Sequence, residues 1–252
     1  MKVLRRIGGE PDLAVQMLEP TASPASAGPP VLLVHGMGGD HTTWTGVARA
    51  LQSAGRAVVG IDLRGHGLSG RAVRYRLNDF RDDLAHVLDV CGADEVDVVA
   101  HSLGAHSALR LAMSQPGRVR RLLLEEPPPM PRDAADLAEG IAQSSSLRER
   151  IRGIGALVAD PRPFLRFDRT IPEAVTVQFG WADRQWWADL AVIDAPTLVI
   201  SGGHRSFLPP RHLHRLADAL PRGEVTTIDS GHSVHRDRPR EFLTQVHRLL
   251  VD

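Results

Sequence analysis

Short runs of apolar residues alternate with longer stretches of mixed character along most of this 252-residue chain. A short, continuously apolar run is typical of a strand buried on both faces, whereas apolar positions that recur every three or four residues indicate a helix with one buried face. The runs predict strands over residues 31–34, 57–61, 121–126, 196–201 and 224–228, and another that starts at Val96. The amphipathic stretches predict helices over residues 42–54, 78–91, 105–114, 210–220 and 239–250, the second capped by Asn78.

Two further apolar stretches precede this alternation, and one long segment interrupts it. Residues 3–7 and 13–18 flank a turn-rich spacer, which predicts a β-hairpin at the sheet edge. Residues 133–189 carry helical patterns over 134–143 and 146–159. This segment then concentrates aromatic side chains: Phe164, Phe167, Phe179, Trp181, Trp186 and Trp187. The pattern predicts an α/β fold with a mostly parallel central sheet of about eight strands, flanked by helices and interrupted by a helical insertion.

Composition narrows the class of protein and its partners. Apolar residues make up 42% of the chain and charged residues 24%, as in an ordinary globular protein. Thirty basic residues balance thirty acidic ones, so neither nucleic acid nor an acidic membrane surface is an expected partner. Cys91 is the one cysteine, which excludes an internal disulfide and suits a reducing compartment. With no secretory signal pattern and no apolar run long enough to span a bilayer, we expect a cytoplasmic protein.

The most specific chemical signal is the apolar strand that runs into Ser102, with a predicted helix directly after it. A strand, a sharp turn and a helix lift a serine hydroxyl clear of the backbone and aim N–H groups at an oxygen that becomes negative. The usual form is Gly-x-Ser-x-Gly; here Ala100 replaces the first glycine and Gly104 keeps the second. Both are small enough for strand and helix to approach closely. The alternative is a serine that only begins a helix after a strand.

Three more motifs, each after a predicted strand, accompany the turn at Ser102. The four motifs are His35-Gly36, residues 62–69 (Asp-Leu-Arg-Gly-His-Gly-Leu-Ser), the turn at Ser102 and Gly231-His232. Together they resemble the α/β-hydrolase family, from about Val31 to the C-terminus. The resemblance implies an α/β-hydrolase fold whose core consists of residues 1–126 and 191–252. Residues 127–190 would then form a helical cap over the active site.

A serine hydroxyl needs a base to take its proton, and histidine is the natural candidate. The family's Gly-His pattern assigns this role to His232. His35 and His101 are expected to line the pocket or to pack. The histidines expected to be solvated or to cap helices are His66, His204, His212, His214, His235 and His247. No histidine has a spacing to Asp or Glu that argues for a metal site, so no metal is predicted.

The acidic partner of His232 is where the sequence departs from the family pattern. Members usually place an aspartate just after the strand at 196–201, where Arg205 stands, and an arginine there would disfavour an imidazolium. Zearalenone-type lactonases and certain haloalkane dehalogenases carry the acid after the preceding strand, where Glu125 and Glu126 stand. We assign it to Glu126, the last residue before three prolines, at the carboxyl edge where such sites form. Glu125 stays open as an alternative, as does Asp229, which is more typical of a turn.

The remaining predicted site residues lie in the loops and in the insertion. The N–H groups of Met37 and Leu103 are the expected oxyanion donors, and Gly36 lets the backbone pass close to a substrate. Three tryptophans are candidates for a flat apolar wall against an aromatic or macrocyclic ligand: Trp181, Trp186 and Trp187. The alternative for these tryptophans is a hydrophobic seam that joins the insertion to the core.

These residues predict a serine hydrolase that cleaves a small-molecule carboxylic ester or lactone through an acyl-enzyme on Ser102, with no cofactor. One alternative is hydrolysis of carbon–carbon bonds in β-diketones or ring-cleavage products, which uses the same residues. Another is a non-hydrolytic, ligand-binding member of the fold, which the missing late aspartate supports. A dehalogenase or epoxide hydrolase would carry Asp in place of Ser102. The natural ester and the oligomeric state do not follow from the sequence.

Overall fold

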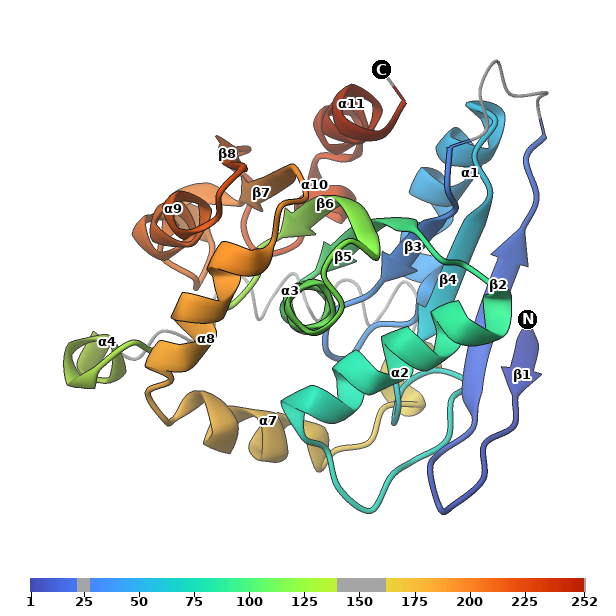
Figure 1. The fold of residues 1–252 in the computed structure, drawn as a ribbon, viewed down its shortest axis with the longest axis horizontal. Coiled ribbons are helices and arrows are strands. Elements are labelled where there is room, and N and C mark those ends of the chain that lie inside the picture. The colour runs from blue at the N-terminus through green and yellow to red at the C-terminus, as the bar shows by residue number, and fades with distance from the viewer. Residues whose placement is uncertain (22–27, 140–161, 252) are drawn as a thin grey trace.

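A computed structural model describes residues 1–21, 28–139 and 162–251 of the chain. Within these residues, eight strands form one sheet in the order β1-β2-β4-β3-β5-β6-β7-β8 (Figure 1). β2 pairs antiparallel with β1 and with β4, and every other pairing is parallel. The strands are β1 (Lys2–Leu4), β2 (Leu13–Leu18), β3 (Val31–Val34), β4 (Val58–Asp62), β5 (Val96–His101), β6 (Val119–Glu125), β7 (Thr197–Ser201) and β8 (Gly223–Thr227). The predicted α/β fold and its mostly parallel sheet are confirmed.

Helices cover both faces of the sheet, with α2 and α3 on one face and α1 and α11 on the other (Figure 1). The helices of the core are α1 (Thr45–Ser53), α2 (Leu77–Cys91), α3 (Leu103–Ser114), α9 (Pro210–Ala219), α10 (Val234–Asp237) and α11 (Pro239–Leu250). Two single 3-10 turns precede α1 and α9, namely η1 (His41–Trp44) and η3 (Gly203–Arg205). In the described part of the chain, no helix is both long and apolar enough to cross a bilayer.

The continuous apolar runs reflect burial on both faces of the sheet. In β3, Leu32 and Val34 join the apolar cluster that includes α2 and α3, whereas Val31 and Leu33 join the cluster that includes α1 and α11. Successive strand residues point to opposite faces, so β3, which is covered on both sides, is apolar at every position. This packing places the carboxyl ends of β3, β5, β6 and β7 side by side at one edge.

Local differences from the predicted elements have identifiable causes. Asn78 does not cap α2: the helix begins one residue earlier, and the carboxylate of Asp79 accepts a hydrogen bond from the backbone N–H of the N-cap residue, Arg76. The Asn78 side chain instead accepts a hydrogen bond from Arg110 on α3, at 2.8 Å. The predicted strand at 121–126 ends at Glu125, because Glu126 turns into the left-handed region with φ of 51°.

The described part of the insertion between β6 and β7 is helical. It contains α4 (Ala134–Glu139), α6 (Arg162–Leu165), α7 (Ile171–Phe179), α8 (Arg184–Asp189) and a 3-10 turn, η2 (Leu190–Val192). Gln178 of α7 accepts from the N–H of Leu77 and donates to the carbonyl of Tyr75, which ties the insertion to α2. Residues 140–143 and 146–159, which we predict to be helical, lie outside the described residues.

Candidate active site

Ser102 stands at a strained turn between β5 and α3. Its φ of 50° and ψ of −117° lie in a region that L-residues rarely adopt. The N–H of Ser102 donates to the carbonyl of Glu125 at 2.9 Å, and its own carbonyl accepts from the N–H of His106 at 2.9 Å. A Cβ at Gly104 would lie 2.4 Å from the carbonyl oxygen of His35, so only glycine lets α3 pass this close to the end of β3. The turn therefore holds the Ser102 hydroxyl away from both β5 and α3.

The structure brings the predicted serine, histidine and glutamate together in a chain of hydrogen bonds. The Ser102 hydroxyl lies 2.9 Å from Nε2 of His232, and Nδ1 of His232 lies 3.1 Å from Oε2 of Glu126. A carboxylate only accepts, so Nδ1 donates to Glu126 and Nε2 is left to accept the Ser102 proton. This arrangement joins residues that are 106 and 130 positions apart in the sequence.

Three donors hold the Glu126 carboxylate in place. Besides His232, the backbone N–H of Gly202 donates to Oε1 at 2.6 Å, and the hydroxyl of Ser206 donates to Oε2. Gly202 and Ser206 belong to the loop after β7, where family members usually carry the aspartate. The loop that lacks the acid therefore binds the acid supplied by the neighbouring strand. The sequence offers no signal for this role of Ser206.

The two other candidates for the acid lie elsewhere. Glu125 accepts from the backbone N–H of His235 at 3.0 Å and from its Nδ1 at 2.6 Å. Burial raises the pKa of Glu125, but His235 and His101 together outweigh that effect and lower the pKa to about 2. Asp229 is exposed and faces Arg205 at 3.4 Å. Consecutive glutamates thus bond two different histidines, His232 in the loop after β8 and His235 in α10.

The predicted oxyanion donors belong to the residue after Ser102 and to the turn after β3. Leu103 is the first residue of α3, so its N–H has no acceptor within the helix. Met37 follows β3 in a turn that the N–H of Gly39 closes onto the carbonyl of Gly36, at 3.1 Å. A Cβ at Gly36 would lie 2.5 Å from Nδ1 of His101 and 3.1 Å from Cβ of Ser102. The absence of a side chain there lets the Met37 turn approach the serine.

Comparison with known proteins identifies the family. A model described as the alpha/beta hydrolase family matches residues 31–245. This chain belongs to the α/β-hydrolase family. The sn-1-specific diacylglycerol lipase ABHD11 of Mus musculus is 24% identical to this hydrolase over 249 residues, which cover 88% of this chain and 81% of that protein.

Solved structures share the fold of this hydrolase over nearly its whole length. An N-acyl homoserine lactone degrading enzyme, Est816, superposes with a TM-score of 0.75 at 24% identity and covers 98% of this chain and 99% of its own. The enol-lactonase of Burkholderia xenovorans LB400 superposes with a TM-score of 0.76 at 19% identity, covering 96% and 97%. At these identities the likeness shows the fold alone.

The three tryptophans of the hydrolase's insertion occupy unlike environments. Trp186 is 2% exposed and stacks on His106 of α3, with ring centroids 5.4 Å apart. Trp187 packs edge-on against Trp186 and donates to the carbonyl of Met130 at 2.7 Å. Trp181 is 69% exposed. The contacts of Trp186 and Trp187 favour a seam between the insertion and the core over a substrate wall.

Several histidines expected to be solvated are buried instead. His66, His212 and His235 are 0%, 2% and 7% exposed. His235 lies 4.8 Å or less, atom to atom, from His101 and Glu125 in a group with the makeup of a metal site, and Asp136, Glu139 and His212 form a second such group among the described residues. In the first group the carboxylate oxygens already accept from His235, and in the second Arg132 pairs with Asp136. Sequence spacing alone gave no indication of either group.

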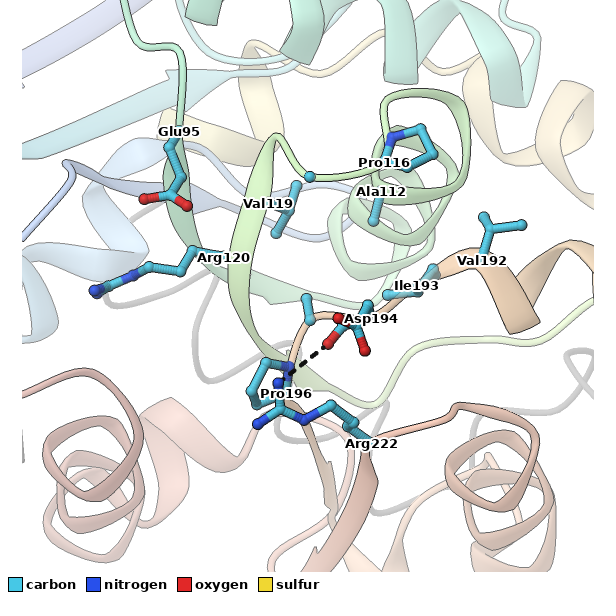
Figure 2. Close-up of a pocket in the computed structure, with 12 residues that line it drawn as sticks. Glu95, Ala112, Pro116, Val119, Arg120, Val192, Ile193, Asp194, Pro196 and Arg222 are labelled. Atoms are coloured by element: carbon cyan, nitrogen blue, oxygen red, sulfur yellow. Dashed lines mark hydrogen bonds between the residues drawn. The ribbon is translucent and has the colours of Figure 1, made fainter.

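A surface cleft of about 200 Å³ lies at the amino ends of the central strands, the end of the sheet opposite to Ser102 (Figure 2). Val119 and Pro196 in its lining stand at the amino ends of β6 and β7, whereas Ser102, Glu126 and Gly202 follow the carboxyl ends of their strands. Arg222, in the lining of this cleft, donates a hydrogen bond to the carbonyl of Asp194 at 3.4 Å (Figure 2). The cleft is therefore separate from the candidate active site.

Proposed function

We propose that this α/β hydrolase is a serine hydrolase that cleaves a carboxylic ester or lactone through an acyl-enzyme on Ser102. One observation carries the proposal: Ser102, His232 and Glu126 form a continuous hydrogen-bonded chain with separations of 2.9 and 3.1 Å. In this order, a hydroxyl, an imidazole and a carboxylate form the arrangement that activates a serine for acyl transfer.

The proposed reaction has two halves. The Ser102 oxygen attacks the ester carbonyl while Nε2 of His232 takes its proton, and Glu126 keeps the ring oriented and stabilises its positive charge. The N–H groups of Met37 and Leu103 stabilise the negative oxygen of the tetrahedral intermediate. His232 then protonates the leaving alkoxide, which departs as an alcohol. A water, deprotonated by the same histidine, releases the carboxylic acid and restores Ser102.

Two further features support an ester or lactone as the substrate. The names of similar proteins include a diacylglycerol lipase, an N-acyl homoserine lactone degrading enzyme and an enol-lactonase, which act on carboxylic esters or cyclic esters. The acid at Glu126 also resembles the arrangement of zearalenone-type lactonases. As part of the same proposal, residues 127–190 form a helical cap and residues 1–126 with 191–252 form the hydrolase core.

The test is a hydrolysis panel of short aryl esters, long acyl esters and aromatic macrolactones, run with wild type, Ser102→Ala and Glu126→Gln. We expect Ser102→Ala to lose about 10⁴-fold or more in kcat and Glu126→Gln to lose up to about 10⁴-fold. A fluorophosphonate probe should label wild type and fail to label Ser102→Ala. Glu241→Gln, on the exposed face of α11, is the matched control and should retain full activity.

Two results would contradict the proposal. Full turnover by Ser102→Ala would show that Ser102 is not the nucleophile. Product analysis that finds a ketone or a shortened acid, rather than an alcohol and an acid, would favour hydrolysis of a carbon–carbon bond.

A further inference from the structure

His101 is a buried histidine that the proposed reaction does not use. It directly precedes Ser102, is 8% exposed, and its Nε2 lies 2.8 Å from the backbone carbonyl oxygen of His232. A carbonyl only accepts hydrogen bonds, so Nε2 of His101 carries a hydrogen and donates it. The residue before the nucleophile is thereby bonded to the backbone of the proposed base, 131 positions away.

The surroundings keep the His101 ring neutral and fix which of its two nitrogens carries the hydrogen. Burial lowers the pKa of His101 well below its usual value; Glu125 opposes this shift, whereas His232, His235 and Arg236 add to it. A neutral imidazole has one hydrogen, which the carbonyl of His232 accepts, so Nδ1 is bare. That side of the ring faces Gly36, where an added Cβ would lie 2.5 Å from Nδ1. The ring therefore fits between the Met37 turn and the His232 loop.

Other backbone hydrogen bonds hold the loop on either side of His232, whereas the imidazole of His232 bonds only Ser102 and Glu126 among the described residues. Before it, the N–H groups of Ser230 and Gly231 donate to the carbonyl of Gly202 at 3.1 and 3.0 Å. After it, the N–H of His235 donates to Glu125 at 3.0 Å. The peptide that joins His232 to Ser233 lies between these anchors, and His101 bonds its oxygen. Rotation of that peptide would swing the Cα that carries the imidazole.

We propose that His101 is a positioning residue, which holds the carbonyl of His232 and so sets the direction in which its imidazole faces Ser102. This inference rests on the proposed function, because His101 acts through His232. Without the donor, a part-buried carbonyl is left unpaired and the backbone that carries the ring loses this anchor, so the ring can shift. A shift of about 1 Å in a reacting group lowers the rate by about 10²-fold.

The matched test compares His101→Gln with His101→Met. The two side chains have similar shapes, but only glutamine can place an N–H near the position of Nε2. We expect His101→Met to lower kcat by about 10- to 100-fold while KM stays within about twofold, since the loss concerns the reacting groups and not substrate binding. His101→Gln should recover most of this loss. The fluorophosphonate labelling rate of Ser102, measured across pH, should follow the same order.

Equal activity of the Gln and Met variants, whether both low or both unchanged, would overturn the inference, because the donor would then not matter. Urea unfolding of each variant shows whether it is folded under the assay conditions.

A second measurement does not depend on catalysis or on either variant's folding. Nitrogen-15 spectra of the histidine rings in Ser102→Ala protein should show His101 with hydrogen on Nε2 and without titration between about pH 5 and pH 8. Hydrogen on Nδ1, or titration in that range, would overturn the inference even if the protein proves not to be an esterase. Conversely, failure of the fluorophosphonate probe to label wild type would contradict the proposed function alone.

Discussion

Ser102 and Glu126 are the only non-glycine residues with positive φ among those that the structure describes, at 50° and 51°. Such a conformation costs on the order of 1–3 kcal/mol and persists only where the surroundings impose it. Both residues directly follow a central strand, and both join the hydrogen-bonded chain through His232. Backbone strain is thus concentrated at the two ends of the proposed catalytic chain.

Gly36 offers a test of how closely the Met37 turn must approach Ser102. We expect Gly36→Ala to reduce kcat/KM by about 10²-fold, because its Cβ would press on the His101 ring at 2.5 Å and on Ser102 at 3.1 Å. Steady-state kinetics with a short aryl ester measures this loss. Gly46→Ala, in α1 with nothing within 4 Å of its Cβ, is the matched control and should keep wild-type activity. Unchanged kinetics in Gly36→Ala would show that the turn is free to retreat.

At the scale of elements, the site is made by strand ends rather than by helices. β5 delivers Ser102, β6 delivers Glu126, and β7 leads into the loop with Gly202 and Ser206. Parallel strands end at the same edge, so an acid can move from one strand to its neighbour while still reaching the same histidine. In this chain, Gly202 and Ser206 of the loop after β7 donate hydrogen bonds to the carboxylate that follows β6.

The β7 loop can be tested through Ser206. Ser206→Ala removes one of the three donors to Glu126, and a hydrogen bond to a charged group contributes about 1.5–3 kcal/mol. We expect a loss of roughly tenfold or more in kcat and a similar loss of about 1.5–3 kcal/mol in unfolding free energy. Ser114→Ala, at the far end of α3, is the control and should change neither. Wild-type kcat in Ser206→Ala would mean that Gly202 and His232 suffice to hold the carboxylate.

For the whole molecule, buried neutral histidines make stability depend on pH. Burial lowers the pKa of His66 to about 3, and burial with the nearby charge of Arg110 lowers the pKa of His106 to about 3. Below the ordinary histidine value of 6.5, the unfolded chain binds protons that the folded chain does not. Stability is therefore complete above about pH 6.5 and is lost as the pH falls toward 3.

Urea unfolding at a series of pH values measures this effect. Each of the two rings should lower the unfolding free energy by up to about 1.4 kcal/mol per pH unit below about pH 6. His106→Gln should flatten the slope, whereas His214→Gln, at an exposed position of α9, should leave it unchanged. An unfolding free energy that stays constant from pH 7 to pH 5 would mean that these rings are protonated in the folded protein.

Whether a site residue could be predicted depended on whether its signal lies in the neighbouring residues of the sequence. Ser102 was predictable because a strand, a small residue and a helix surround it, and that context is local. His232 and Glu126 required the family resemblance, which supplies the order of strands.

His235 gave no sign of burial against Glu125, because a histidine in a polar segment looks the same in the sequence whether it is solvated or paired. Trp186 and Trp187 left packing and ligand binding equally open, since both uses favour large aromatic side chains.

The sequence by itself determined which segments are strands and helices, because burial on one face or two imposes a period that can be read along the chain. It also determined the mostly parallel sheet, since strands that alternate with helices pair in parallel. Only the tertiary structure decided which glutamate faces His232, which donors hold that glutamate, and where His101 directs its hydrogen. These depend on separations of about 3 Å between residues far apart in the chain, and no periodicity along the chain encodes such distances.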